Sequence, residues 1–135
     1  MKCSDRYIEV EDCNDRFKFR VWNTLINAYE EDGFLLDVRK GKVAGQNTDI
    51  YILEQCTGLR DRNGKLIYEG DVVKCDIDFV PDGRVGLIRR VVFKDGAFQL
   101  ISEDGSFYFI MGFHNIEIIG NVHEGVKNED CDSES

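Results

Sequence analysis

The sequence is poor in proline, since Pro81 is its only one against 13 glycines. Turns must therefore be made mostly by Gly together with Asn and Asp. No apolar run is long enough to cross a bilayer, and the polar N-terminus lacks the apolar segment of a signal peptide. The sequence predicts a cytoplasmic protein without membrane contact.

The five cysteines do not form a pattern. Their odd count and wide spacing argue against a disulfide framework, and the absence of a C-x-x-C pair argues against a zinc ribbon. Cys56 and Cys75 fall in expected strands and are predicted to be small buried side chains, while Cys3, Cys13 and Cys131 fall near the ends. A reducing compartment is expected.

Motifs of catalysis and cofactor binding are also missing. Neither common phosphate-binding loop occurs, and no Ser or Cys lies in a nucleophile motif. His114 and His123 have no third ligand at a metal spacing, so surface or turn positions are expected for both. We expect a protein that is not an enzyme and holds no metal or cofactor.

The net charge of -9 is concentrated in the ends of the chain. Residues 1–15 contribute -3 and residues 124–135 contribute -4, which leaves -2 for residues 16–123. A nearly neutral body argues against a DNA mimic and lacks the basic excess of most nucleic-acid binders. Residues 1–15 are expected to be flexible, and residues 126–135 a disordered acidic tail.

The remaining chain has the pattern of a mainly β protein in two parts. In residues 16–54, alternation over 17–22 and apolar stretches at 34–38 and 50–53 predict a small N-terminal β subdomain. In residues 55–125, short strands are expected at 72–79, 85–93, 98–102, 107–111 and 116–122. Asp95-Gly96 predicts a hairpin, and residues 112–115 suit a helical turn. The second part therefore predicts a sandwich or small barrel.

The run from Gln55 to Val73 carries the strongest local signals. Asn63-Gly64 predicts a two-residue type I′ turn, and Glu69-Gly70-Asp71 predicts a second turn. The charged residues of this run invite a catalytic interpretation. Turn chemistry explains them better, because Asp side chains accept hydrogen bonds from nearby backbone N–H groups. The structural turn residues are predicted to be Asp61, Asn63, Gly64, Gly70 and Asp71.

Three elements of the chain resemble the YopX family of phage and prophage proteins, over about residues 16–125. The central element comprises Thr57, Gly58, Leu59, Asp61, Gly64, Ile67, Tyr68, Glu69, Gly70, Asp71 and Val73. The other two are an F-R-x-W element at Phe19, Arg20 and Trp22, and an I-G-N-x-x-E element at Ile119, Gly120, Asn121, Val122 and Glu124. The chain departs from the pattern at residues 1–15, at 78–90, and at Gly125, where the family often has Asn.

The resemblance implies an all-β protein in which residues 55–125 form an SH3-type barrel. It also implies a phage or prophage origin and a bacterial cytoplasm. The family has no assigned biochemical function, so no catalytic residue is carried over.

Two classes of function are expected. The first is a phage accessory protein that acts by protein contact, as a homo-oligomer or with a host protein. The alternative is binding of nucleic acid or a small nucleotide by the face that carries Arg16, Lys18, Arg20 and Trp22, since basic side chains beside an aromatic ring suit phosphates and bases. The same stripe also suits the solvated face of an edge strand, which the near-neutral body favours. The candidate binding residues are Arg20, Trp22, Arg60, Arg62 and Tyr68.

Overall fold

The computed structural model describes residues 15–31, 33–45, 48–77 and 83–126. Within these ranges the protein is mainly β, as predicted, and contains no α-helix. Its short 3₁₀ turns are η2 (Asp15–Phe17), η3 (Thr48–Ile50) and η4 (Ile110–Gly112). None of the described helical segments has the length and apolarity that a bilayer crossing requires.

The N-terminal part forms a four-stranded antiparallel sheet in the order β2-β1-β5-β6. Its strands are β1 (Phe19–Asn23), β2 (Ala28–Tyr29), β5 (Tyr51–Arg60) and β6 (Leu66–Tyr68). A separate small hairpin is formed by β3 (Leu36–Asp37) and β4 (Lys42–Val43). β1 lies between β2 and β5, but β2 pairs only with Trp22 and Asn23, so the earlier residues of the basic stripe have β5 as their one described strand neighbour.

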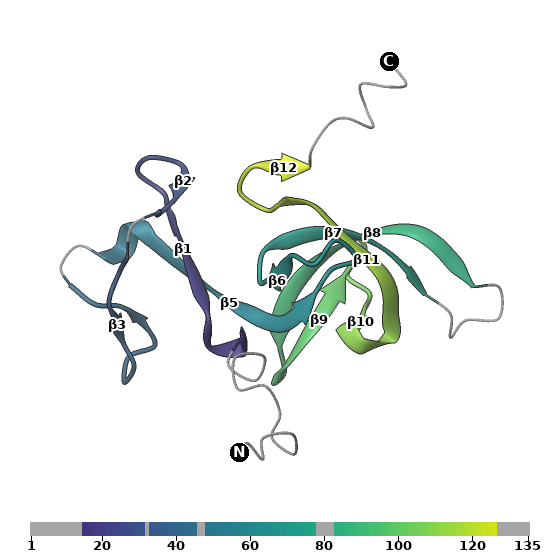
Figure 1. The fold of residues 1–135 in the computed structure, drawn as a ribbon, viewed down its shortest axis with the longest axis horizontal. Coiled ribbons are helices and arrows are strands. Elements are labelled where there is room, and N and C mark those ends of the chain that lie inside the picture. Colours follow the sequence, from purple (N-terminus) through teal and green to yellow (C-terminus); the bar gives the residue numbers. More distant parts are fainter. Residues whose placement is uncertain (1–14, 32, 46–47, 78–82, 127–135) are drawn as a thin grey trace, which may run out of the picture.

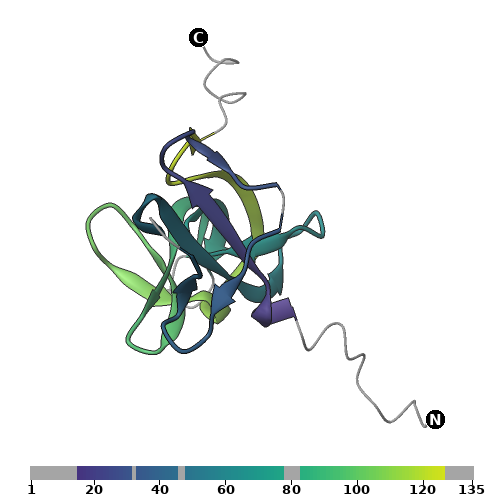
Figure 2. The same cartoon turned by 90° about the vertical axis from the view of Figure 1, so that its left-hand side faces the viewer.

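The C-terminal part forms a six-stranded antiparallel sheet in the order β10-β9-β8-β7-β11-β12. Its strands are β7 (Asp71–Ile77), β8 (Arg84–Lys94), β9 (Ala97–Ile101), β10 (Phe107–Phe109), β11 (Phe113–Asn121) and β12 (Gly125–Val126). This sheet curls into a half-barrel beside the N-terminal sheet (Figures 1 and 2). The SH3-type closure that the family resemblance implies stays a prediction.

The two sheets are joined by the long strand β5, which runs from one toward the other (Figure 1). The boundary predicted between residues 54 and 55 falls in the middle of this strand. Ile67 of β6 is fully buried in the core of the curled sheet, together with Val73, Leu100 and Phe113. Burying a side chain of this size stabilises the fold by roughly 1.5–3 kcal/mol. The run from Gln55 to Val73 therefore contributes to both sheets.

The turn between β5 and β6 differs from the predicted type I′ turn. A type I′ turn needs positive φ at both Asn63 and Gly64, but only Gly64 has it, at +87°. Asp61 Oδ1 accepts the N–H groups of Asn63 and Lys65, both at 2.9 Å, and Asp61 N donates to Lys65 O at 2.8 Å. The Asp61 side chain thus closes a longer loop, in which a single residue needs the left-handed conformation.

The curled sheet contains a predicted hairpin and a predicted helical turn. Asp95 and Gly96 have φ of +54° and +83°, as a type I′ hairpin requires, and they connect β8 to β9. The helical turn predicted at residues 112–115 lies instead at 110–112, because β11 already begins at Phe113. Cys56 and Cys75 are buried and free, as predicted.

Several predictions concern residues outside the described ranges. These are the flexible segment up to residue 14, the tail from 127, and Cys3, Cys13 and Cys131. Within the segment predicted to be flexible, only Asp15 is described, and it is buried. Its carboxylate lies 3.1 Å from Lys18 Nζ and 3.4 Å from Arg60 Nη2.

Candidate functional site

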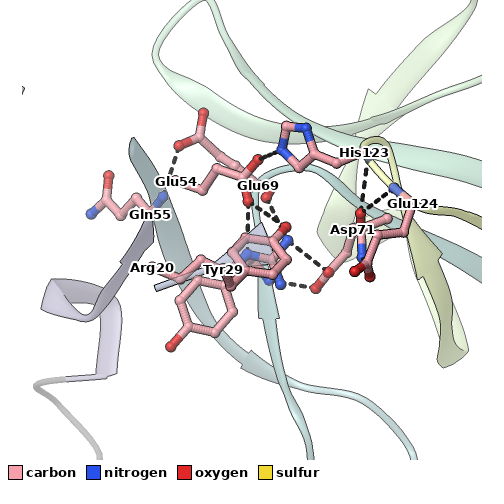
Figure 3. A network of polar contacts seen from close by, with 10 residues as sticks. Arg20, Tyr29, Glu54, Gln55, Glu69, Asp71, His123 and Glu124 are labelled. Carbon is pink, nitrogen blue, oxygen red and sulfur yellow. Dashed lines mark hydrogen bonds and ion pairs between the residues drawn. The ribbon is translucent and has the colours of Figure 1, made fainter. Parts of the chain in front are cut away.

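Three polar side chains meet on the face of the four-stranded sheet that is turned toward the curled sheet. Arg20 of β1 and Glu54 of β5 are direct cross-strand partners, and Tyr29 of β2 lies opposite Trp22. Side chains alternate between the faces of a strand, so Arg20 and Trp22 share this face. Figure 3 shows the resulting polar cluster.

Glu54 lies at the centre of the cluster. Its Oε1 accepts hydrogen bonds from Arg20 Nε at 2.7 Å and from Tyr29 Oη at 3.0 Å, and its Oε2 lies 2.6 Å from His123 Nε2. The Glu54 side chain is only 6% exposed. A buried carboxylate is tolerated when its oxygens are hydrogen-bonded, and here both oxygens have partners.

Arg20 connects this carboxylate to the turn between β6 and β7. Its Nη2 lies 2.9 Å from Asp71 Oδ1 and donates to the backbone oxygen of Glu69 at 3.1 Å. The guanidinium carbon lies 4.5 Å from the centre of the Tyr29 ring and 4.8 Å from that of the Tyr68 ring. The guanidinium group of Arg20 is therefore held by ion pairs at its edge and by aromatic rings near its faces.

Burial and ion pairing act on the pKa values of the cluster in opposite directions. Burial alone would lower the pKa of Arg20, but the carboxylates of Asp71 and Glu54 raise it above its ordinary value. Burial raises the pKa of the Asp71 carboxyl, and Arg20 opposes this shift. Burial also raises the pKa of Tyr29, so its hydroxyl stays a neutral donor to Glu54.

The turn between β6 and β7 is attached to the four-stranded sheet by its own side chains. Glu69 Oε1 accepts the N–H of Gln55 at 2.9 Å, and Glu69 N donates to Gln55 O at 2.9 Å. Asp71 Oδ2 accepts the N–H of Tyr68 at 2.8 Å while Oδ1 faces Arg20. Asp71 is thus a turn residue and an ion-pair partner at once.

Gly70 lies between these two carboxylates and directly beside Glu54. Its φ is +87°, and a Cβ at this position would lie 2.6 Å from Glu54 Oε2. Its backbone also connects two elements, because Gly70 N donates to Val91 O at 2.9 Å and Gly70 O accepts from Val122 N at 2.8 Å. Both the backbone angle and the close approach require glycine.

The turn between β11 and β12 supplies the histidine. Asn121 Oδ1 accepts the N–H groups of His123 and Glu124 at 2.9 and 2.8 Å, and Asn121 Nδ2 donates to Glu124 Oε1 at 2.9 Å. The His123 ring stacks on the Trp22 ring with centroids 4.4 Å apart and planes at 8°. The turn therefore places His123 between Trp22 and Glu54.

All three elements that carry the family resemblance meet in this cluster. Arg20 and Trp22 come from the first, Gly70 and Asp71 from the second, and the Asn121 turn with its His123 from the third. The Glu54 and Asp71 side chains are 6% and 3% exposed. Because the carboxylates are enclosed and bonded, the arrangement suits a connection between the sheets rather than acid–base chemistry on a substrate.

The predicted binding face is closed at Trp22 but open at Arg16 and Lys18, which are exposed. Trp22 is 4% exposed and covered by His123, so it offers no ring to a nucleic-acid base. The spacing correctly places Arg20 and Trp22 on one face, but that face is internal. Lys18 pairs with Asp15 at 3.1 Å, and the guanidinium of Arg16 lies 4.3 Å from the centre of the Phe17 ring.

Three of the five candidate binding residues do come together. Arg20, Arg60 and Tyr68 line one hollow of about 330 Å³, along with Lys65 and Asp71. Arg60 is oriented by hydrogen bonds from Nη1 to Gly64 O at 2.8 Å and from Nη2 to Asp15 Oδ2 at 3.4 Å. Three cationic side chains and one carboxylate thus surround this hollow.

Arg62 lies apart from that hollow. Its guanidinium points toward β11, where it lies 3.4 Å from Asn115 Oδ1 and 3.6 Å from Glu117 Oε1. Its backbone N–H donates to Ile116 O at 2.8 Å. Arg62 therefore helps to attach the turn between β5 and β6 to the curled sheet.

Sequence reasoning missed Glu54, Tyr29 and His123 as members of the cluster. Glu54 lies in the apolar stretch YILEQC, and a lone carboxylate inside such a strand is itself a signal of a buried partner. His123 was expected at a surface or turn; it lies in a turn, but its side chain is only 13% exposed. Within the described part of the chain, no group of His, Cys, Asp and Glu suits a metal ion.

Comparisons with known proteins agree with this fold. A family model described as YopX protein matches residues 35–127. Protein EF1440 from Enterococcus faecalis is similar at 24% identity and a TM-score of 0.54, over 79% of this chain and 93% of that one. Protein YopX from Bacillus subtilis is similar at 21% identity and a TM-score of 0.52, over 82% of this chain and 95% of that one.

No match was found among curated proteins. The matched range contains the central and closing elements, whereas the F-R-x-W element precedes it. Since the family model covers more than half of the sequence, this chain belongs to the YopX family.

Proposed function

We propose that the protein is a non-enzymatic accessory protein of phage or prophage origin that acts in the bacterial cytoplasm through contacts with protein surfaces. Membership of the YopX family supports the lineage. The carboxylates of the polar cluster are enclosed and ion-paired, which supports a structural role for this cluster. One surface feature, the strand β10, carries the proposal of protein contact.

β10 is an aromatic strand at the edge of the curled sheet. It consists of Phe107, Tyr108 and Phe109, which are 40%, 47% and 63% exposed, and Met111 just beyond it is 84% exposed. In the described sheet β10 pairs only with β9. Exposed edge strands are usually protected by charged side chains or proline, and β10 has neither.

In the described part of the chain, the outer edge of β10 has no strand partner. Ser102 N donates to Ser106 O, which makes these two residues a hydrogen-bonded pair. Such pairs alternate along an antiparallel ladder, so Tyr108 points its backbone groups toward Leu100. Phe107 then directs its N–H and C=O groups outward, and Phe109 its N–H, while the C=O of Phe109 accepts the first bond of η4 as its N-cap residue. This is the geometry that accepts an added strand from a partner.

Phe109 permits a clean test of strand addition. Its φ of -58° is the angle that proline adopts, so Phe109→Pro removes the outward N–H while keeping the backbone conformation. Phe109→Ala is the matched control, because it removes the ring and keeps the N–H. The measurements are light scattering of the purified full chain and affinity capture from a bacterial host lysate.

We expect a stoichiometric complex, with itself or with a host protein, that Phe109→Pro abolishes and Phe109→Ala weakens less. A protein that is monomeric at every concentration and retains no stoichiometric host partner overturns the proposed function. If the complex persists in both variants, the contact does not involve β10.

The hollow beside the turn between β5 and β6 supports a second candidate function, the binding of a nucleotide or single-stranded nucleic acid. Arg20, Arg60 and Lys65 offer positive charge around about 330 Å³, and Tyr68 offers a ring for stacking. The test is titration with adenosine monophosphate and a single-stranded oligonucleotide at low ionic strength. Binding should weaken with salt and with Lys65→Glu, but not with Lys40→Glu in the β3–β4 turn. No response at low salt removes this candidate.

A further inference from the structure

We infer that the strand added to β10 belongs to a second copy of this chain, in an antiparallel pair whose two-fold axis passes through Tyr108. This inference rests on the proposed function, because it names the partner of the same edge. It follows from the order of side chains in β10, the direction of its backbone groups, and the charges around it.

The order of side chains in β10 is symmetric about its centre. The strand reads Phe107-Tyr108-Phe109. In an antiparallel pair centred on Tyr108, Phe107 lies opposite Phe109 of the second copy, and the reverse holds at the other end. A two-fold interface needs such a self-complementary surface, since both copies present the same patch.

The backbone groups agree with this register. Phe107 directs its N–H and C=O groups outward and Phe109 directs its N–H outward, as the alternation from the Ser102–Ser106 pair requires. In the register centred on Tyr108, each Phe107 meets a Phe109 whose N–H also faces it. These become the hydrogen-bonded pairs, in which the N–H of Phe109 donates to the C=O of Phe107 in the other copy. A shift by one residue would pair an outward-facing residue with one whose groups face its own sheet.

The side chains also fall on matching faces. Tyr108 is opposite the fully buried Leu100, so it lies on the core side, where its ring is 6.4 Å from that of Phe113. Phe107 and Phe109 lie on the outer side. The pair would therefore join the outer aromatic rings of both copies into one cluster, and contacts between aromatic rings are favourable beyond the area they bury.

Charge favours the antiparallel direction. β10 has no charged residue, although the chain carries a net charge of -9. The acidic turn with Glu103 and Asp104 precedes β10, so a parallel pair would place the two acidic turns side by side. An antiparallel pair puts them at opposite ends. Lys94 lies beside the strand, with its Nζ 4.5 Å from the centre of the Phe107 ring.

The exposed area predicts a weak, concentration-dependent dimer. Phe107, Tyr108 and Phe109 are 40%, 47% and 63% exposed. At about 200 Å² for a whole aromatic side chain, these residues offer on the order of 300 Å² per copy. Both copies together then bury less than the roughly 1,200 Å² of a standard stable interface. Covalent capture is therefore the appropriate test.

The register predicts which cysteine pair can be captured. Tyr108 would lie opposite Tyr108 of the second copy in a non-hydrogen-bonded pair, with Cα atoms about 4.5 Å apart. That distance suits a disulfide. Two Phe107 positions would be offset by two residues along the strands, or about 8 Å apart, which is too far.

The experiment compares Tyr108→Cys with Phe107→Cys in the full chain, with Cys3, Cys13 and Cys131 replaced by Ser. The native Cys56 and Cys75 are buried and do not interfere. Under mild oxidation we expect a covalent dimer from Tyr108→Cys, little from Phe107→Cys, and loss of the dimer when Phe109→Pro is added. A monomeric Tyr108→Cys, or equal capture of both cysteines, overturns this register.

Sedimentation of the unmodified chain over a concentration series provides a measurement that needs no cysteine variant. An association lost in Phe109→Pro supports the second copy. No association at any concentration overturns it. If a host complex is nevertheless lost in Phe109→Pro, the proposed function stands and only the identity of the partner is wrong.

Discussion

His123 Nε2 lies 2.6 Å from Glu54 Oε2, although His123 follows β11 of the curled sheet and Glu54 lies in the middle of β5. The contact joins the turn between β11 and β12 to a strand of the other sheet, although the two residues are far apart in the sequence. Arg20 completes it by bridging Glu54 to Asp71. Residues that resemble an active site in composition thus hold the architecture together.

Removing the charge at Glu54 should destabilise the protein. In Glu54→Gln an amide would face three donors, and Arg20 would lose one of its two carboxylates. Breaking a buried ion pair from one side typically costs about 3–5 kcal/mol, and the remaining pair with Asp71 places the expected loss near 3 kcal/mol. Equilibrium unfolding in urea measures it. The exposed Glu103→Gln is the control, with an expected change within about 0.5 kcal/mol. Equal stability of both variants would contradict the role of Glu54.

Two glycines allow the steric effect at Glu54 to be separated from backbone strain. Gly64 and Gly70 both have φ of +87°, but a Cβ meets nothing within 4 Å at Gly64 and lies 2.6 Å from Glu54 Oε2 at Gly70. Gly64→Ala should cost about 1–2 kcal/mol, the usual penalty of the left-handed conformation. Gly70→Ala should cost clearly more, because its partners prevent Glu54 from moving aside. Urea unfolding of both variants tests this, and equal losses would mean that Glu54 can relocate freely.

Local features were readable from the sequence. The pair Asp95-Gly96 needs only its own backbone angles to form a hairpin, and the alternation of Arg20 and Trp22 needs only the geometry of one strand. The turn at Asn63 was misjudged because Asp61 closes a longer loop with its side chain. Side-chain competition of this kind is not visible in the pair Asn-Gly alone.

Long-range features were not readable. Whether the face of Arg20 is internal depends on Glu54 and His123, which are distant in sequence and carry no shared motif. The predicted division at residue 54 falls within β5, which continues across it and pairs with β6 as well as β1. Such pairings are decided by packing between sheets rather than by local propensity.

Asp61 should make stability depend on acid pH. Burial alone would raise the pKa of Asp61, but backbone N–H groups of Ile118, Lys65 and Asn63 lower it below the usual 3.8. The folded state therefore releases this proton more readily than the unfolded chain. The stabilisation is complete above the unfolded pKa and is lost as the pH falls toward the lowered folded value.

The test compares the native chain with Asp61→Asn in urea at a series of pH values. At neutral pH the variant should be less stable by about 1–3 kcal/mol, because its amide group cannot accept all three backbone bonds. The difference should shrink as the pH falls below 4 and the aspartate itself becomes protonated. A constant difference over this range would contradict the lowered pKa.

The two buried thiols should be inert in the folded protein. Burial raises the pKa of Cys75 to about 11, and burial also raises that of Cys56. Relative to a thiol at the ordinary value of 9.0, Cys75 then has about a hundredfold less reactive thiolate at pH 8. In the chain with Cys3, Cys13 and Cys131 replaced by Ser, a disulfide reagent should therefore find no fast thiol without denaturant and two in urea. The Ser variants leave both buried thiols in place, so the same sample serves as its own control. Fast reaction of either thiol in the folded protein would mean that β5 or β7 opens locally, because the thiol must reach solvent before it can ionise and react.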